Sequence, residues 1–302
     1  MNSRLKKILL STLKAITNRF DHSPFLQSVS RHLPLWRKTS VVCRLSRYPK
    51  NVTAKCLNIT YQLNLTDLLQ REIYFNCYDG KQLAKLLRHI VPGGVYIDVG
   101  ANVGFYSLHI AKKIQGNGKI YSFEADPILH KRLDANCSLN RFGRTIKTYN
   151  LAITNCEKIV PFYVHGEGAS GQGSLIHHPA LTGKVVEVRG MTLDRFLKEE
   201  RLEKVSFIKI DIEGGEFELL NGAKRALTEQ RFEKIYIEFN GTLQLQRGKT
   251  FKDFLQLFAD YGYHPQDLNR KLLMKLQSGK ISPEKIVTDF LFSTERSMSD
   301  CF

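Results

Sequence analysis

The chain has 302 residues, of which 42% are hydrophobic and 25% charged, and its formal net charge is +16. This composition excludes a disordered chain and a bundle of membrane helices, and it suits one large domain with an appendage. Residues 1–90 hold 16 of the 45 Lys and Arg but only 4 of the 29 Asp and Glu. The basic charge, which would suggest nucleic acid or an anionic membrane as partner, therefore belongs mainly to the N-terminal part.

The first element predicted is an amphipathic basic helix within residues 1–22. Five apolar residues share one helical face and Lys and Arg occupy the other, the apolar ones being Leu5, Leu9, Leu13, Ile16 and Phe20. Lys14 interrupts the apolar run and no cleavage site follows, so a spanning helix and a signal peptide fit poorly. The helix either attaches peripherally to an anionic membrane or packs on the protein itself or a second subunit.

We expect two regions: a basic extension over residues 1–50 and one domain over residues 51–302. The six cysteines are scattered, without a C-x-x-C pair, which is typical of reduced thiols. A cytoplasmic location, with the N-terminal helix on the inner face of a membrane as an option, follows from these observations. The oligomeric state is left open.

After residue 51, strand and helix patterns alternate. Residues 52–78 predict short strands, including "EIYFNCY", and a hairpin. Further strands are predicted at 95–99, 119–124, 145–149, 205–211, 234–239 and 286–292, and helices near 104–115, 127–140, 215–228 and 250–261. This alternation indicates an α/β fold with an open, mostly parallel sheet covered by helices on both faces.

The turn after the strand at 95–99 is the first candidate binding site. In "DVGANVG", Gly100 and Gly104 bracket Ala101 and Asn102, so that the backbone and a helix N-terminus can approach a ligand carboxylate. A dinucleotide site would require glycine where Asn102 stands. Asp98 adds a negative charge before the turn, which suits the ammonium and sulfonium groups of S-adenosylmethionine (SAM) better than a diphosphate.

The next strand ends at Glu124, in "FEADP". A carboxylate at this position can accept two hydrogen bonds from a ribose diol. The alternative for both Asp98 and Glu124 is that each caps a turn or a helix. Their occurrence at the ends of consecutive strands favours the binding interpretation.

The segments "YIDVGANVGFYSLHIA", "FEADP", "LAIT", "MTLDRFL", "FIKIDIEGGEFELLNGA" and "IYIEFN" occur here in that order. In sequence and approximate spacing they resemble the FkbM family of SAM-dependent methyltransferases, over residues 74–292. The resemblance implies a Rossmann-like class I methyltransferase sheet of seven strands with an antiparallel final strand. It also implies O-methylation of a sugar, glycan or polyketide hydroxyl, and adenine contacts near residues 150–153, which include Ala152. Ala125, next to Glu124, is a further cofactor-binding candidate. The family often has "FEP" where this chain has "FEAD".

The block "FIKIDIEGGEFELL" carries the candidate chemistry. Alternation places Lys209, Asp211 and Glu213 on one side of the predicted strand, and in "KIYIEFN" it places Glu238 similarly. If these strands are neighbours, as in the family's fold, the four charges converge beyond the sheet. Asp211 or Glu213 is then the general base for a hydroxyl, Lys209 offsets the negative charge, and Glu238 orients the acceptor.

Two other interpretations of this block are ranked below base chemistry. The second is a structural ion-pair network, and the third is a divalent cation held by the carboxylates. The block also bears on the acceptor, because an acidic mouth repels phosphate. We therefore expect the acceptor to be a small molecule or glycan and no nucleic acid. A nucleic-acid methyltransferase and a non-catalytic, membrane-recruited SAM-binding protein are the alternatives.

The glycine-rich residues 165–179 are predicted as a lid over the acceptor or a flexible connection.

Overall fold

The computed structural model describes residues 51–164, 173–176, 184–266 and 285–295, together with residues 272, 278 and 280–282. The predicted N-terminal helix and most of the glycine-rich segment lie outside the described residues. None of the helices in the described ranges has the length and the apolar character to cross a membrane.

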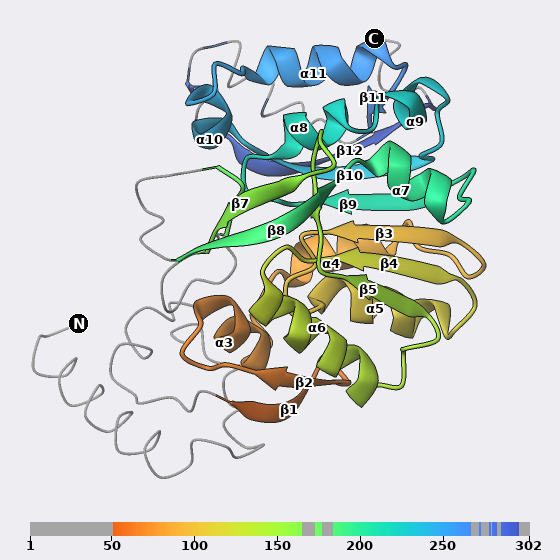
Figure 1. The fold of residues 1–302 in the computed structure, drawn as a ribbon, viewed down its shortest axis with the longest axis vertical. Coiled ribbons are helices and arrows are strands. Elements are labelled where there is room, and N and C mark those ends of the chain that lie inside the picture. Colours follow the sequence, from red (N-terminus) through yellow and green to blue (C-terminus); the bar gives the residue numbers. More distant parts are fainter. Residues whose placement is uncertain are drawn as a thin grey trace, which may run out of the picture.

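A seven-stranded sheet forms the centre of the described part of the chain (Figure 1). In spatial order its strands are β11 (His264–Pro265), β12 (Val287–Ser293), β10 (Lys234–Asn240), β9 (Phe207–Ile210), β3 (Val95–Val99), β4 (Lys119–Phe123) and β5 (Ile146–Tyr149). Strands β10, β9, β3, β4 and β5 run parallel, and β12 pairs antiparallel with both β10 and β11. This confirms the predicted Rossmann-like class I methyltransferase sheet with its antiparallel final strand.

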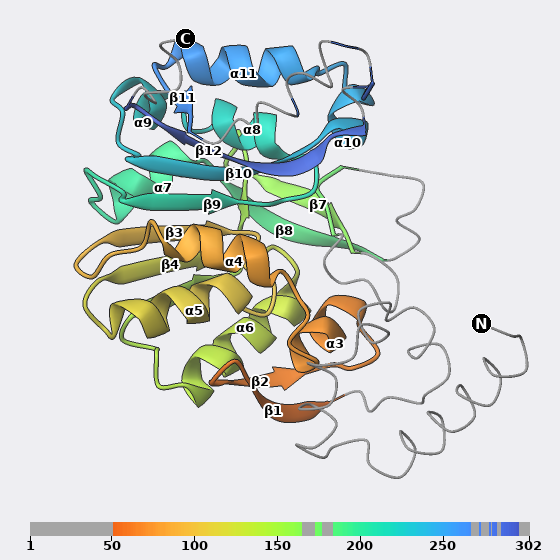
Figure 2. The same cartoon turned by 180° about the vertical axis from the view of Figure 1, so that it is seen from behind.

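Helices lie on both faces of this sheet (Figures 1 and 2), and alternation along the strands divides the core between these faces. On β9, Ile208 and Ile210 pack into one core while Phe207 packs into the other. The first core receives α7 (Leu193–Glu199), α8 (Glu216–Asn221), α9 (Lys224–Thr228) and α11 (Phe251–Asp260). The second receives α4 (Gly80–Leu87), α5 (Phe105–Ile114) and α6 (Pro127–Leu139). Helices on both faces were predicted and are confirmed.

The N-terminal part of the described chain is a hairpin followed by a helix. Strands β1 (Val52–Cys56) and β2 (Ile59–Leu63) pair antiparallel, as predicted. The strand predicted at "EIYFNCY" is wrong, because α3 spans Leu68–Tyr74. Asp67 starts this helix by accepting a hydrogen bond from the Gln70 backbone N–H at 3.0 Å, and such a cap outweighs the β-forming side chains that follow.

Two further departures concern the middle of the chain. A small sheet not predicted as such contains β6 (Ala152–Ile153), β8 (Val185–Met191) and β7 (Ile159–Tyr163), in that order. The helix predicted over 215–228 is interrupted between α8 and α9. Asp194 causes the interruption, because its carboxylate accepts from the backbone N–H groups of Arg225 (2.9 Å) and Ala226 (2.8 Å) and so begins a new helix.

Candidate active site

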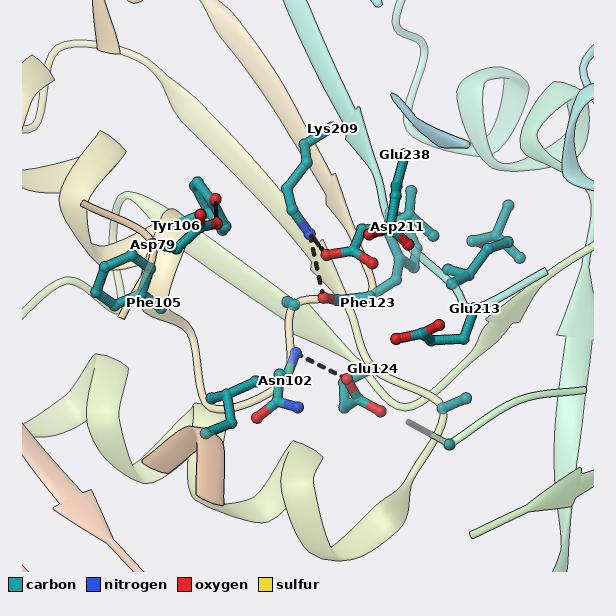
Figure 3. A pocket seen from close by; sticks show the side chains of 18 of the residues that line it. Asp79, Asn102, Phe105, Tyr106, Phe123, Glu124, Lys209, Asp211, Glu213 and Glu238 are labelled. Carbon is teal, nitrogen blue, oxygen red and sulfur yellow. Dashed lines mark hydrogen bonds and ion pairs between the residues drawn. The ribbon is translucent and has the colours of Figure 1, made fainter. Parts of the chain in front are cut away.

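A cavity of about 470 Å³ opens at the carboxyl ends of β3, β4, β9 and β10. This edge of a parallel sheet is where ligands of α/β proteins bind. The cavity brings together ten of the twelve predicted site residues: Gly100, Ala101, Asn102, Glu124, Ala125, Ala152, Lys209, Asp211, Glu213 and Glu238. Figure 3 shows Glu124 and Asn102 on one side and Lys209, Asp211 and Glu238 on another. The remaining two, Asp98 and Gly104, do not line it.

Gly100 is required where it stands. Its φ of +79° lies in the left-handed region, and a Cβ atom there would come within 1.8 Å of the Asp211 carbonyl oxygen. The first turn of the predicted ligand cradle is therefore in direct backbone contact with the first residue after β9. Gly104 has a packing role instead, since a Cβ atom would meet Leu133 Cδ1 at 2.7 Å.

Glu124 joins the ends of the first two strand-to-helix turns. One carboxylate oxygen accepts from the Asn102 backbone N–H at 2.7 Å and the other from that of Asp126 at 2.8 Å. Burial raises the pKa of Glu124 to about 7, although these two hydrogen bonds oppose the shift. Each oxygen keeps a second lone pair, so the side chain can hold the turn and still accept from a ligand hydroxyl.

Asp98 is fully buried beneath the cavity. It accepts a hydrogen bond from the Ser107 hydroxyl at 2.5 Å, and its other oxygen lies 3.5 Å from the Lys209 ammonium. Asp98 therefore faces a cation of the protein itself rather than the open cavity. Asp98 affects the cavity only indirectly, because its negative charge offsets the positive charge of Lys209.

Lys209 is the only cation among the residues that line the cavity in the described part of the chain. Its ammonium lies 3.1 Å from the Asp211 carboxylate and 3.4 Å from the Gly100 carbonyl oxygen, and 5.0 Å from the centre of the Tyr106 ring. Burial alone lowers the pKa of Lys209, but Asp211 and Asp98 outweigh burial and raise it above its ordinary value. Lys209 is therefore charged and joins the two acids.

Three carboxylates of the predicted catalytic block lie together. Oxygen atoms of Asp211, Glu213 and Glu238 are all within 4.8 Å of one another. Burial, followed by repulsion from Asp211, raises the pKa of Glu213 to about 8 and that of Glu238 to about 10. At neutral pH both groups therefore hold a proton and can donate a hydrogen bond, whereas Asp211 is paired with Lys209.

Glu213 lines the cavity as predicted, but it does not lie on the strand face that alternation assigns to it. Strand β9 ends at Ile210, and Glu213 lies on the following turn with a φ of +51°. It therefore faces the cavity from this turn, and residues 209, 211 and 213 do not share a strand face. Glu238, in contrast, lies on β10 as predicted, and β10 pairs directly with β9.

Three acids that line the same cavity were not predicted, and Glu72 on α3 is the first of them in the chain. Asp79 precedes α4 and accepts a hydrogen bond from the Tyr106 hydroxyl. Asp289 on β12 is paired in register with Glu238, and burial followed by repulsion from Asp211 raises its pKa to about 6. A lone acid within the apolar strand "VTDFLFS" was a signal for Asp289, whereas Asp79 stands in a loop that gave none.

A match to a known protein family agrees with this geometry. The profile of the methyltransferase FkbM domain matches residues 98–265, which is more than half of the chain. The chain belongs to the FkbM methyltransferase family.

Individual relatives of this family member are distant or short. The 2-O-methyltransferase NoeI of Sinorhizobium fredii is 24% identical over 213 residues, which cover 65% of this chain and 84% of NoeI. The AMB antimetabolite synthetase AmbE of Pseudomonas aeruginosa is 24% identical over 197 residues, 53% of this chain and 9% of AmbE. The human tRNA (guanine(37)-N(1))-methyltransferase is 30% identical over 94 residues, 31% of this chain and 17% of the human protein.

Proposed function

We propose that this FkbM-family protein is a SAM-dependent O-methyltransferase that acts on a hydroxyl of a sugar, a glycan or a polyketide-like acceptor. The observation that carries the proposal is that one cavity combines residues suited to bind SAM with a cluster of carboxyl groups suited to bind a hydroxyl. A glycine turn and the Glu124 carboxylate lie at one end, and the Asp211–Glu213–Glu238 cluster lies at the other.

The residues at the first end fit SAM. The turn at Gly100 has no side chain to block a ligand, and Glu124 presents a carboxylate suited to the ribose hydroxyls. Asp98, Lys209 and Asp211 together carry one net negative charge behind this turn, which favours a sulfonium cation. When bound, SAM supplies an electrophilic methyl group.

The residues at the second end can position and deprotonate a hydroxyl. Attack of the acceptor oxygen on the methyl carbon forms the C–O bond, breaks the C–S bond and releases S-adenosylhomocysteine. Asp211 is the proposed base, because Glu213 and Glu238 already hold protons at neutral pH. Those two carboxyl groups instead orient the acceptor by donating hydrogen bonds. Positioning of this kind contributes about 7 kcal/mol or more to lowering the barrier.

The alternative functions have less support. A nucleic-acid methyltransferase is suggested by the tRNA-modifying relative. The single lysine on the cavity wall of the described chain, Lys209, is however already paired with Asp98 and Asp211 and so offers little to a substrate phosphate. The carboxyl groups on the wall belong to Glu72, Asp79, Glu124, Asp211, Glu213, Glu238 and Asp289. A non-catalytic SAM-binding protein would not need several buried carboxyl groups whose charged forms are costly.

The test measures formation of S-adenosylhomocysteine from SAM with defined acceptors: neutral methyl glycosides, an amino sugar, a uronic acid and unmodified tRNA. We expect transfer to a sugar hydroxyl. We expect Asp211→Asn to bind SAM with unchanged affinity and to lose at least about a hundredfold in turnover, as when a general base is removed. The exposed carboxylate of Glu229 serves as the control, as Glu229→Gln. Transfer to tRNA alone, or turnover of the Asp211 variant within a few-fold of wild type, would refute the proposal.

A further inference from the structure

The turn that follows β9 holds an unfavourable backbone conformation. Glu213 has a φ of +51° and Gly214 a φ of +98°. A residue other than glycine in the left-handed region persists only when its surroundings impose that conformation. Because this turn carries both Asp211 and Glu213, the contacts that impose it also decide where two of the acidic side chains in the cavity lie.

Glu216, the first residue of α8, supplies the innermost of these contacts. Its side chain is 1% exposed and does not line the cavity. One carboxylate oxygen accepts from the backbone N–H of Gly214 at 3.1 Å and, at the longer distance of 3.4 Å, from that of Ile212. The residues on either side of Glu213 are therefore attached to a single side-chain oxygen.

Gln244 secures Glu216 from the other side. It belongs to α10 (Gly241–Leu245), the short helix that follows β10, and its side chain is fully buried. Its amide nitrogen donates both to the second carboxylate oxygen of Glu216 and to the Gly214 carbonyl oxygen, the latter at 3.2 Å. The turn after β9 is thus tied to the helix after β10, the strand that carries Glu238.

Two further side chains complete the arrangement. Arg247 donates to the Gly214 carbonyl oxygen at 2.7 Å, and the Ser174 hydroxyl donates to the Glu213 carbonyl oxygen at 2.7 Å. These residues contact only the carbonyl side of the turn. Glu216 accepts from the N–H groups of the turn. Arg247 and Ser174 donate to its carbonyl oxygens and therefore cannot take over the role of Glu216.

We propose that Glu216 and Gln244 are positioning residues of this site: together they hold the turn so that the Asp211 and Glu213 carboxyl groups face the acceptor. The inference rests on the proposed methyl transfer for its catalytic consequence, but the contact itself is independent of it. A purely stabilising role explains the arrangement less well. An apolar side chain would fill the same space without the cost of burying a carboxyl group. That cost is evident for Glu216, because burial raises its pKa to about 7.

Asp194 offers a matched control. Like Glu216 it is a carboxylate that does not line the cavity and accepts from two backbone N–H groups, those of Arg225 and Ala226, but these belong to the start of α9 and not to the turn after β9. Substitution of either acid by alanine removes the same type of contact. Only Glu216→Ala should affect the geometry of the catalytic turn.

The experiment compares Glu216→Ala, Glu216→Gln, Gln244→Ala and Asp194→Ala in the full chain by three measurements. The first is amide hydrogen exchange at Ile212 and Gly214, the second is SAM affinity by calorimetry, and the third is kcat and KM for methyl transfer to the neutral methyl glycosides. For Glu216→Ala we expect exchange at both amides to accelerate about tenfold or more and SAM affinity to stay unchanged. We expect kcat to fall about thirtyfold or more with little change in KM, because a misplaced turn affects the transition state.

The other variants separate positioning from folding. Glu216→Gln keeps an oxygen that can accept both N–H groups but turns an NH2 group toward the Gln244 amide nitrogen, so Glu216→Gln and Gln244→Ala should both lose less of kcat than Glu216→Ala. Asp194→Ala should lose stability while keeping kcat. Equal kcat losses in Glu216→Ala and Asp194→Ala, or unchanged exchange at Ile212 and Gly214, would overturn the inference. If the wild-type protein methylates none of the sugars, the proposed function fails, and the exchange measurement still decides whether Glu216 holds the turn.

Discussion

Replacement of Gly100 by alanine should destabilise the protein in two ways. It should strain the backbone at this position, and it should force the ends of two neighbouring strands apart. The left-handed φ of +79° costs an alanine about 1–2 kcal/mol. In addition, the new Cβ atom would lie 1.8 Å from the Asp211 carbonyl oxygen, and contacts below 3.0 Å are essentially never seen. The ends of β3 and β9 must therefore separate by about 1.2 Å, the difference between these distances, which adds the roughly 1–3 kcal/mol typical of overpacking.

Gly248 is the matched control for this substitution. Its φ is +68°, but a Cβ atom there would have nothing within 4 Å, so Gly248→Ala reports only the cost of the backbone conformation. Urea denaturation should show a loss of about 2–5 kcal/mol for Gly100→Ala and about 1–2 kcal/mol for Gly248→Ala. Calorimetry should show weaker SAM binding for Gly100→Ala alone. Equal losses of stability in the two variants, with unchanged SAM affinity, would refute the close contact between the turn at Gly100 and Asp211.

Three further predictions concern the charges in the cavity. Burial, helped by Asp211, raises the pKa of Glu213 to about 8, so the folded state keeps a proton that the unfolded chain releases near pH 4.5, and stability should fall as pH rises between roughly 4.5 and 8. Glu213→Gln should therefore raise the melting temperature relative to wild type at about pH 8.5 but not at about pH 5; an equal change at both pH values would contradict the assignment. Lys209→Met leaves Asp98 buried without a cation and should cost about 3–5 kcal/mol in urea denaturation, and a loss below about 1 kcal/mol would show that the pair is dispensable. Excess EDTA should leave turnover unchanged, because Lys209 offsets Asp211 and the other two acids hold protons; a loss that Mg²⁺ restores would instead place a cation among the three carboxylates.

The sheet could be predicted because its strands are short apolar runs between strong turn signals. The alternation of Ile208 and Ile210 with Lys209 identified the two faces of β9 correctly. The interruption between α8 and α9 could not be predicted in this way, since it depends on Asp194, which precedes it by about thirty residues. Contacts between distant segments override the local helical pattern there.

In the candidate site, too, some residues could be predicted from the sequence and others could not. Glu124 and Asp211 were predictable because parallel strands bring their carboxyl ends to one edge. Asp98 was predicted to face a ligand, yet it lies beneath Lys209, because a fully buried carboxylate needs a partner that the linear pattern does not reveal. The role of Asp79 depends on a tertiary contact with Tyr106, and that of Glu216 on one with Gln244. No spacing of residues in the sequence predicts either contact.

The place of β12 has a consequence for how the enzyme is assembled during synthesis. This strand inserts between β10 and β11, both of which are translated before it, and it brings Asp289 opposite Glu238. A nascent chain that has emerged only as far as β11 already contains the glycine turn, Lys209 and Asp211, but it lacks the strand that brings Asp289 to the cavity, and the edge of β10 is open. Ribosome-bound intermediates of this protein should therefore acquire donor binding before they acquire acceptor selectivity.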